Sequence, residues 1–461
     1  MFRKTVPLLV MLIILIFLTG CQKDHGLNPQ DPITLTLWHN YGGQMKETMD
    51  SMVDEFNETL GRENGIIIYV TSISSSEALH DKLTMAANGD FGAPDLPDIS
   101  TSNPKTAVLL SKKDLLLDFT EQFTEEELDT YVPRFIEEGM LGTDSLYIFP
   151  TAKSTEILFL NKTLFDRFAK DTGATYDDLR TFQGIKNTAA LYYDWSDAQT
   201  PLIPNDGKSF YHTDSLFNLA QVGCKQMGSE FITGESIDYS SISFKRIWDF
   251  YYPSAVKGHF SIYDGYASDL MKTGEIICST GSTAGILFYN PMVTYPDNTT
   301  EDIELMLLPY PTFQDGEKIA IQRGSGMIAI KSSEAKAHAQ ALFLKWFTRP
   351  ENNLRFVAST GYLPVTREAY GKVMSREIEN EENKNMRSLL RVAITMQGNY
   401  DFYIPPLFDG MDKLQKDYEV RMREAAELSR LEYKTLLDNM GPDAAYEKWS
   451  ESIFNTFISG E

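Results

Sequence analysis

Two short motifs of serine acyl-transfer chemistry occur in the sequence. Residues 254–257 read S-A-V-K and match S-x-x-K, and residues 272–274 read K-T-G. The S-D-N element of the same chemistry is missing, because Ser196 and Asp197 are followed by Ala198. The two motifs also lie too close together for that layout. A surface loop and a helix end are the better interpretation.

Other catalytic and metal-binding patterns are missing as well. The sequence has no G-x-S-x-G, no Walker loop and no H-E-x-x-H, and its six histidines, at 25, 39, 80, 212, 259 and 338, share no ligand spacing. A carboxylate pair for glycoside hydrolysis stays open, because it is defined by separation in space rather than in sequence. We therefore expect no catalytic residue, no metal and no cofactor, with a surface-anchored glycan-active enzyme as the alternative.

The N-terminus has the pattern of a bacterial lipoprotein export signal. A cationic M-F-R-K start precedes an apolar run over 6–18, and L-T-G comes directly before Cys21. The run is shorter than the roughly 20 residues that span a bilayer. We expect 1–20 to be a signal peptide, Cys21 to carry lipid including palmitate, and 21–32 to be a tether. The folded part would then lie at the extracytoplasmic face of the cell membrane.

Composition restricts the class of partner. The chain has 461 residues, 42% of them hydrophobic, and a net charge of −23. This length suits two or three globular domains, and the negative charge would repel nucleic acid. Besides Cys21 only Cys224 and Cys278 occur, so one disulfide or two buried thiols are the alternatives, and the thiols are the simpler one.

Strands and helices alternate from residue 33 onwards. Alternating apolar and β-branched residues predict a strand at 33–38, and helical spacing predicts a helix over 44–60. The same periodicities predict further strands at 66–70, 96–99, 146–149, 157–160, 276–280 and 327–331, and helices at 76–88, 162–171, 215–227, 243–252, 267–273, 335–347, 412–440 and 444–458. This order predicts an α/β fold with mostly parallel sheets, whose ligands bind beyond the carboxyl ends of the strands.

Several segments, in order, match one known family. They are T-L-T-L-W-H-N at 34–40, L-Y-I-F-P at 146–150, S-T-E-I-L-F-L-N-K-T-L-F at 154–165, the stretch 267–278 with G-S-T-A-G at 281–285, G-S-G-M-I-A-I at 324–330 and T-G-Y-L-P-V at 360–365. Together they resemble extracellular solute-binding proteins of family 1, the receptors of ABC importers for maltodextrins, other sugars and glycerol phosphates.

The resemblance implies a two-lobe, periplasmic-binding-protein-like fold that closes around its ligand. Lobe 1 would comprise 33–150 plus 309–365, and lobe 2 would comprise 151–308 plus 366–461. The implied function is that of a monomeric, lipid-anchored subunit that delivers a carbohydrate or polyol to ABC permease subunits. A ligand sensor without a permease is a further alternative.

The resemblance and the chemistry of sugars together suggest a set of ligand-binding residues. Sugars stack their apolar faces on aromatic rings and pair their hydroxyls with donors and acceptors. The candidates are Trp38, Tyr41, Tyr362, Trp195 and Phe408 for stacking, and His39, Ser102, Ser154, Thr155, Glu156, Ser282, Thr283, Arg323 and Gly324 for polar contacts. Trp38 and Tyr362 could equally be core residues. Thr283 stands where maltodextrin receptors often have an aromatic residue, which disfavours a long maltodextrin.

Overall fold

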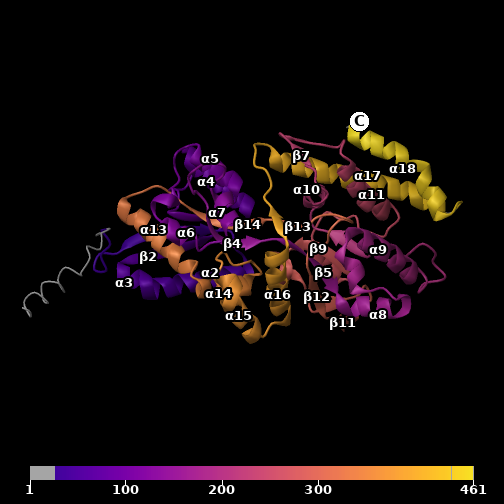
Figure 1. The fold of residues 1–461 in the computed structure, drawn as a ribbon, viewed down its shortest axis with the longest axis horizontal. Coiled ribbons are helices and arrows are strands. Elements are labelled where there is room, and N and C mark those ends of the chain that lie inside the picture. The colour runs from indigo at the N-terminus through magenta and orange to yellow at the C-terminus, as the bar shows by residue number, and fades with distance from the viewer. Residues whose placement is uncertain (1–25, 438, 460–461) are drawn as a thin grey trace, which may run out of the picture.

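The computed structural model describes residues 26–437 and 439–459, which form two helix-flanked lobes side by side (Figure 1). This arrangement confirms the predicted α/β two-lobe fold. The expected signal peptide and Cys21 lie outside the described residues.

The first lobe is built on a five-stranded sheet in the order β2-β1-β3-β14-β4. Its strands are β1 (Ile33–His39), β2 (Ile66–Ser72), β3 (Ile99–Ser102), β4 (Phe149–Ser154) and β14 (Arg323–Ala329). The flanking helical segments are α2 (Gly43–Phe56), η1 (Asn57–Gly61), α3 (Arg62–Asn64), α4 (Ser76–Asn88), α5 (Pro104–Ser111), η2 (Phe119–Glu121), α6 (Glu125–Leu128), α7 (Pro133–Gly139), α13 (Glu334–Phe347), α14 (Pro350–Thr360), η5 (Ala369–Val373) and α15 (Met374–Asn380).

The second lobe contains a four-stranded sheet in the order β12-β5-β9-β6. Its strands are β5 (Glu156–Asn161), β6 (Tyr211–Thr213), β9 (Cys278–Ser282) and β12 (Leu305–Leu308). Around it lie α8 (Lys162–Thr172), η3 (Tyr176–Arg180), α9 (Phe182–Asp197), α10 (Leu216–Gln226), α11 (Ile242–Val256), α12 (Ala267–Lys272), η4 (Thr283–Phe288), α17 (Met411–Leu437) and α18 (Pro442–Ser459). Two-stranded pairs are β7 (Ile232–Thr233) with β8 (Ser236–Ile237), β10 (Met292–Thr294) with β11 (Thr300–Asp302), and β13 (Ile319–Ile321) with β15 (Asp401–Tyr403).

Pairing within the two main sheets is mixed, whereas the sequence pattern predicted mostly parallel sheets. β1 pairs in parallel with β2 and β3, whereas β14 is antiparallel to both β3 and β4. In the second lobe β6 is parallel to β9, but β5 is antiparallel to β9 and β12. The antiparallel strands include β5 and β14, through which the chain passes between the lobes. A strand that comes from the other lobe enters the sheet from the end opposite to that at which the strands of the βα units begin.

Three segments connect the lobes. β4 leads directly into β5 through Thr155, β13 leads into β14 through Gln322, and α16 (Lys384–Asn399) lies between the lobes (Figure 1). Core packing crosses the boundaries expected from the sequence: Tyr310 and Phe313 belong to the second core, and Met374 and Ile378 belong to the first. We therefore propose lobe limits at these three connections.

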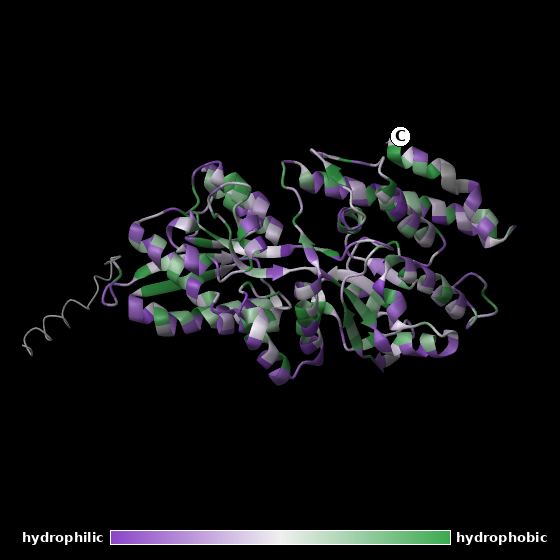
Figure 2. Cartoon of the chain, viewed as in Figure 1, coloured by the Kyte–Doolittle hydropathy of each residue, from purple (hydrophilic) through white to green (hydrophobic). Residues whose placement is uncertain are grey.

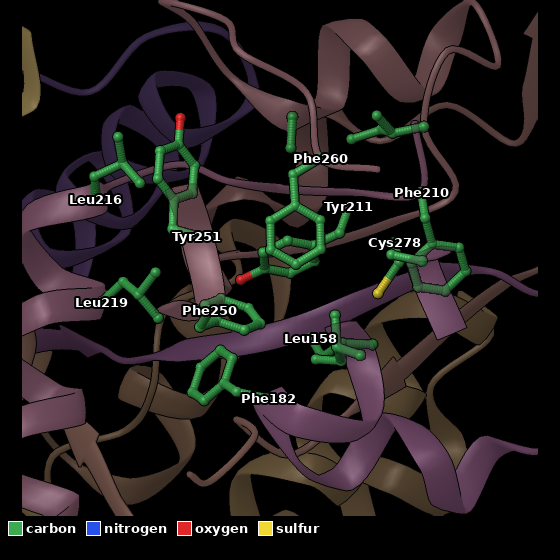
Figure 3. Packing of buried hydrophobic residues seen from close by; sticks show 14 of the residues in the cluster. Leu158, Phe182, Phe210, Tyr211, Leu216, Leu219, Phe250, Tyr251, Phe260 and Cys278 are labelled. Atoms are coloured by element: carbon green, nitrogen blue, oxygen red, sulfur yellow. The ribbon is translucent and has the colours of Figure 1, made fainter. Parts of the chain in front are cut away.

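Both lobes have apolar cores that explain their stability. Figure 2 shows hydrophilic residues mainly on the outer faces of the helices and hydrophobic residues on the strands. Figure 3 shows Leu158, Phe182, Phe250 and Phe260 of the second lobe packed together, and all four side chains have no exposed surface or nearly none. Burial of such side chains is the main favourable contribution to folding.

The cysteines of the described part are Cys224 and Cys278, which are buried and not joined by a disulfide. Burial raises the pKa of the Cys224 thiol to about 12. Both side chains therefore serve as small apolar core residues. Within 26–437 and 439–459, no helix combines the length and apolar character needed to cross a bilayer.

Candidate functional site

A cavity of about 1240 Å³ lies between the two lobes. The first lobe contributes the end of β3 with Ser102 and the start of α5, and the second contributes the start of α10, Ser282 of β9 and the segment 404–412. These elements place the ends of strands and the starts of helices at the opening, where polar backbone and side-chain groups are free to contact a ligand. We call this cavity the interlobe cleft.

The structure brings half of the residues suggested by the sequence to the interlobe cleft. The residues that line it are Ser102, Ser154, Ser282, Arg323, Gly324, Tyr362 and Phe408. Those that do not line it are Trp38, His39, Tyr41, Thr155, Glu156, Trp195 and Thr283.

Glu156 lies directly beneath the cleft rather than in it. Its side chain is fully buried, and Oε1 accepts hydrogen bonds from Asn218 Nδ2 at 2.6 Å and Arg323 Nη1 at 3.3 Å. Burial raises the pKa of the Glu156 carboxyl, and the Arg323 charge acts against this increase. Asn218 and Arg323 both line the cleft, so Glu156 orients two groups that can contact a ligand.

Thr155 and Thr283 stabilise the connection between the lobes. Thr155 Oγ1 donates to the carbonyl of Ile321 at 2.7 Å, and the Thr283 N–H donates to the carbonyl of Thr155 at 2.8 Å. Both residues are buried. These bonds join the β4–β5 connection to the β13–β14 connection and to the end of β9.

Three candidates near the end of β1 lie behind the cleft. His39 is fully buried, with Nδ1 accepting from the Tyr41 N–H at 3.1 Å, and burial lowers its pKa. The ring of Tyr41 lies 6.0 Å from the ring of Tyr362, which it supports from the side of the core. Trp38 is half-buried and packs against the small cluster of Ile73, Leu79 and Leu83, as in its core interpretation.

Trp195 has a different environment from the other candidates. It is located near the end of α9, where its ring packs against Phe168 and its Nε1 donates to Asp171 Oδ2 at 3.0 Å. These contacts give it a structural role in the second lobe.

Gly324 occupies a position that requires glycine. Its φ is +98°, and a Cβ atom there would lie 2.6 Å from the carbonyl oxygen of Ala152. Further along β14, the register with β4 shifts between Ser325 and Gly326. This close backbone approach fixes the start of β14 and, with it, Arg323 at the edge of the cleft.

Sequence reasoning missed two buried amides in the cleft. Asn218 and Gln221 both line it, and they lie three residues apart on α10, whose other buried residues are mostly apolar. Polar residues at this spacing share one face of a helix. The two amide side chains that interrupt an otherwise mostly apolar helix were therefore the sequence signal that could have identified these cleft residues.

Carboxylates outnumber cations around the cleft. Its lining includes Lys105, Lys112 and Arg323 against Glu137, Glu138, Glu235, Asp409 and Asp412. Lys105 forms an ion pair with Asp412, and Lys112 Nζ lies 3.6 Å from Asp409 Oδ2. Burial lowers the pKa of His80, another lining residue, which favours its neutral form. An anionic ligand would therefore meet a net negative surface.

The serine of the S-x-x-K motif is not placed for catalysis. Ser254 lies inside α11 rather than in a surface loop, and it is 1% exposed. Its Oγ donates to the Phe250 carbonyl at 2.8 Å. In the part of the chain that the structure describes, no group of histidine, cysteine and carboxylate side chains could hold a metal ion.

Comparison of the sequence with known protein families identifies the family of this chain. The profile of the bacterial extracellular solute-binding proteins matches residues 51–384. The chain belongs to this family. Its relatives include the sn-glycerol-3-phosphate-binding periplasmic protein UgpB of Escherichia coli strain K12, which is 23% identical over 363 residues, covering 74% of this chain and 76% of UgpB.

Several solved structures share the fold. The cyclic α-maltosyl-1,6-maltose binding protein of Arthrobacter globiformis has a TM-score of 0.64 at 18% identity, covering 93% of this chain and 100% of that chain. UgpB from Mycobacterium tuberculosis, solved with glycerophosphocholine, has a TM-score of 0.63 at 15% identity, covering 93% and 99%. The sugar-binding protein MalE of Xanthomonas citri has a TM-score of 0.63 at 14% identity, covering 93% and 98%.

Proposed function

We propose that this solute-binding protein is the lipid-anchored receptor subunit of an ABC importer and binds a carbohydrate or related polyol without a phosphate group. The observation that carries the proposal is the interlobe cleft, to which both lobes contribute neutral hydrogen-bonding side chains beside the ring of Tyr362. Such a combination suits hydroxyl groups and the apolar face of a sugar ring.

The charge of the cleft favours one of the two ligand classes that the similar proteins bind. Among the cations that line the cleft, Lys105 and Lys112 pair with aspartates and Arg323 pairs with Glu156. A phosphate would compete with these carboxylates for the cations, whereas a neutral ligand leaves the pairs unchanged. We therefore favour a neutral polyol over glycerol phosphate.

The test is a thermal-shift screen of mono- and oligosaccharides together with sn-glycerol 3-phosphate, followed by calorimetry. We expect at least one neutral carbohydrate to raise the melting temperature and sn-glycerol 3-phosphate to have no effect. Stabilisation by sn-glycerol 3-phosphate alone would contradict the proposed ligand class. Release of new reducing ends from a bound glycan would favour the glycan-active enzyme.

Delivery to a permease and anchoring by lipid need their own tests. Loss of uptake of the bound carbohydrate after deletion of the gene would support an importer, and normal uptake would favour a sensor. Labelling with a fatty acid should mark the wild type and not Cys21→Ala, because Cys21 is the expected lipidation site. Label on Cys21→Ala would contradict the lipoprotein assignment.

A further inference from the structure

A second cavity, of about 300 Å³, lies in the second lobe at the carboxyl end of β6. Its lining includes Asp214, directly after β6, three tyrosines at 251, 263 and 266, and Glu419 of α17. None of these residues belongs to the interlobe cleft. We call this cavity the side pocket.

The side pocket continues the line of the interlobe cleft along α17. Met411 and Gln415 line the cleft, and Glu419 and Arg423 line the side pocket. Residues spaced by four share one face of a helix. At the start of α10, Leu216 lines the pocket, and Asn218, two residues further on, lines the cleft. The two cavities are therefore neighbours along α17 and α10.

Carboxylates dominate the side pocket, and its one arginine is already paired. Arg423 Nη2 lies 2.8 Å from Asp264 Oδ1, and Arg423 Nη1 lies 3.8 Å from Glu419 Oε2. Glu419 Oε1 is also held by hydrogen bonds from Ser215 Oγ at 2.7 Å and the Phe217 N–H at 3.1 Å. The remaining carboxylate is that of Asp214.

Asp214 has no cationic partner among the described residues. Its Oδ1 accepts a hydrogen bond from the Ala267 N–H at 2.8 Å, and none of the ion pairs of the described chain includes it. Burial, reinforced by the negative charge of Glu156, raises the pKa of Asp214 to about 7. A carboxylate in this setting gains stability from a bound cation.

The tyrosines make the pocket suitable for an organic cation rather than a bare ion. Figure 3 shows the hydroxyl of Tyr251 pointing away from the apolar core. The ring of Tyr263 lies 6.0 Å from the ring of His212 and covers Gly265, where a Cβ atom would be 2.4 Å from Tyr263 Cε1. Tyr266, 70% exposed, stands at the edge. Aromatic faces attract alkylammonium groups.

We propose that the side pocket binds an organic ammonium group, with Asp214 as its counter-charge and tyrosine rings around it. Resting on the proposed function, this defines the ligand further as a polyol or sugar that carries an amine. The hydroxyls would lie in the interlobe cleft and the ammonium group in the side pocket.

The test uses choline and its neutral isostere 3,3-dimethylbutan-1-ol, which have the same shape and differ in charge. Calorimetry on the full chain should show choline binding at least about tenfold more tightly. Asp214→Asn should remove this preference. Glu432→Gln removes the same charge from an exposed position of α17 outside the pocket, and it should keep the preference.

Equal binding of the two probes by the wild type, or a preference that persists in Asp214→Asn, would overturn the proposal. If Asp214→Asn fails to fold, Tyr263→Leu is the second variant, and it should lower choline affinity while leaving the isostere unaffected. Failure of the proposed function is distinguishable, because carbohydrates would then not bind the wild type even where choline does.

Discussion

At the scale of single residues, two carboxylates of the second lobe, Glu156 and Asp214, differ in their partners. Glu156 pairs with the cation Arg323 and accepts a hydrogen bond from Asn218, and both of these residues line the cleft. Asp214 has only a backbone donor. An unpaired buried carboxylate is costly to ionise, so proteins retain one where a ligand supplies the missing charge or where protonation is tolerated.

Asp214 should make stability depend on pH. Its folded pKa of about 7 lies above the ordinary 3.8, so the folded state holds the proton more firmly and stability falls as pH rises from about 4 to about 7. The charged groups acting on it include Glu156, Asp269 and Arg323. Asp214→Asn should remove this loss, gaining up to about 4 kcal/mol at pH 8 and little at pH 4. Urea unfolding at both pH values checks this, and an equal effect at both would contradict it.

Tyr362 should contribute directly to affinity. Its ring faces the cleft and is supported by Tyr41 and Phe356. Tyr362→Ala should weaken binding of the best screened carbohydrate by about ten- to a hundredfold, because a stacking face is lost. Trp38→Ala is the control, since Trp38 does not line the cleft and packs against the core cluster that includes Ile73 and Leu83. It should lower the melting temperature and leave affinity within about twofold, as measured by calorimetry.

At the scale of secondary-structure elements, the site depends on how β4, β5 and β14 meet. The same few residues end one strand, begin the next and line the cleft, so small backbone displacements move Ser154 and Arg323 together. The close approach of Gly324 to Ala152 fixes this junction. Preorganised polar groups bind with less entropic cost than mobile ones.

Gly324→Ala should damage this junction. The Cβ atom would meet the Ala152 carbonyl oxygen at a residue whose φ is +98°. We expect a loss of about 1–3 kcal/mol in unfolding free energy, together with weaker ligand binding. Gly398→Ala is a matched control, because it lies in α16 with no atom near the added Cβ, and it should be neutral or stabilising. Equal effects of the two changes in urea unfolding would contradict the prediction.

Sequence patterns predicted the secondary-structure elements better than they predicted which way individual side chains point. The period-two pattern at 33–38 and the helical spacing at 44–60 correspond to β1 and to the helical segment that begins at α2. The side of the sheet to which Trp38 and His39 point depends on later packing, because either face of a buried strand can be apolar. Asn218 and the segment 404–412 reach the cleft only through tertiary contacts, which local periodicity does not encode.

At the scale of the whole molecule, closure of the two lobes should control ligand release. Lys105 and Lys112 of the first lobe pair with Asp412 and Asp409 from the second across the cleft. All four side chains are more than half exposed, and such pairs contribute little individually and are screened by salt. Together they favour the closed arrangement at low ionic strength.

Removing both pairs should speed ligand dissociation. In Lys105→Gln/Lys112→Gln we expect a dissociation rate about two- to fivefold higher at low salt, with the difference disappearing at about 1 M salt. Stopped-flow measurement of the best screened carbohydrate checks this. Lys113→Gln, a neighbouring lysine outside the cleft lining, is the control and should leave the rate unchanged. A salt-independent difference would contradict the prediction.

Helix α16 has a consequence for how the molecule denatures. It contributes Leu390 to the first core and Met386 and Leu389 to the second, all buried. Melting of either lobe would therefore remove side chains from the interior of the other. Differential scanning calorimetry should record one cooperative endotherm rather than two. The lobes would then move as separate bodies during closure but unfold together on heating.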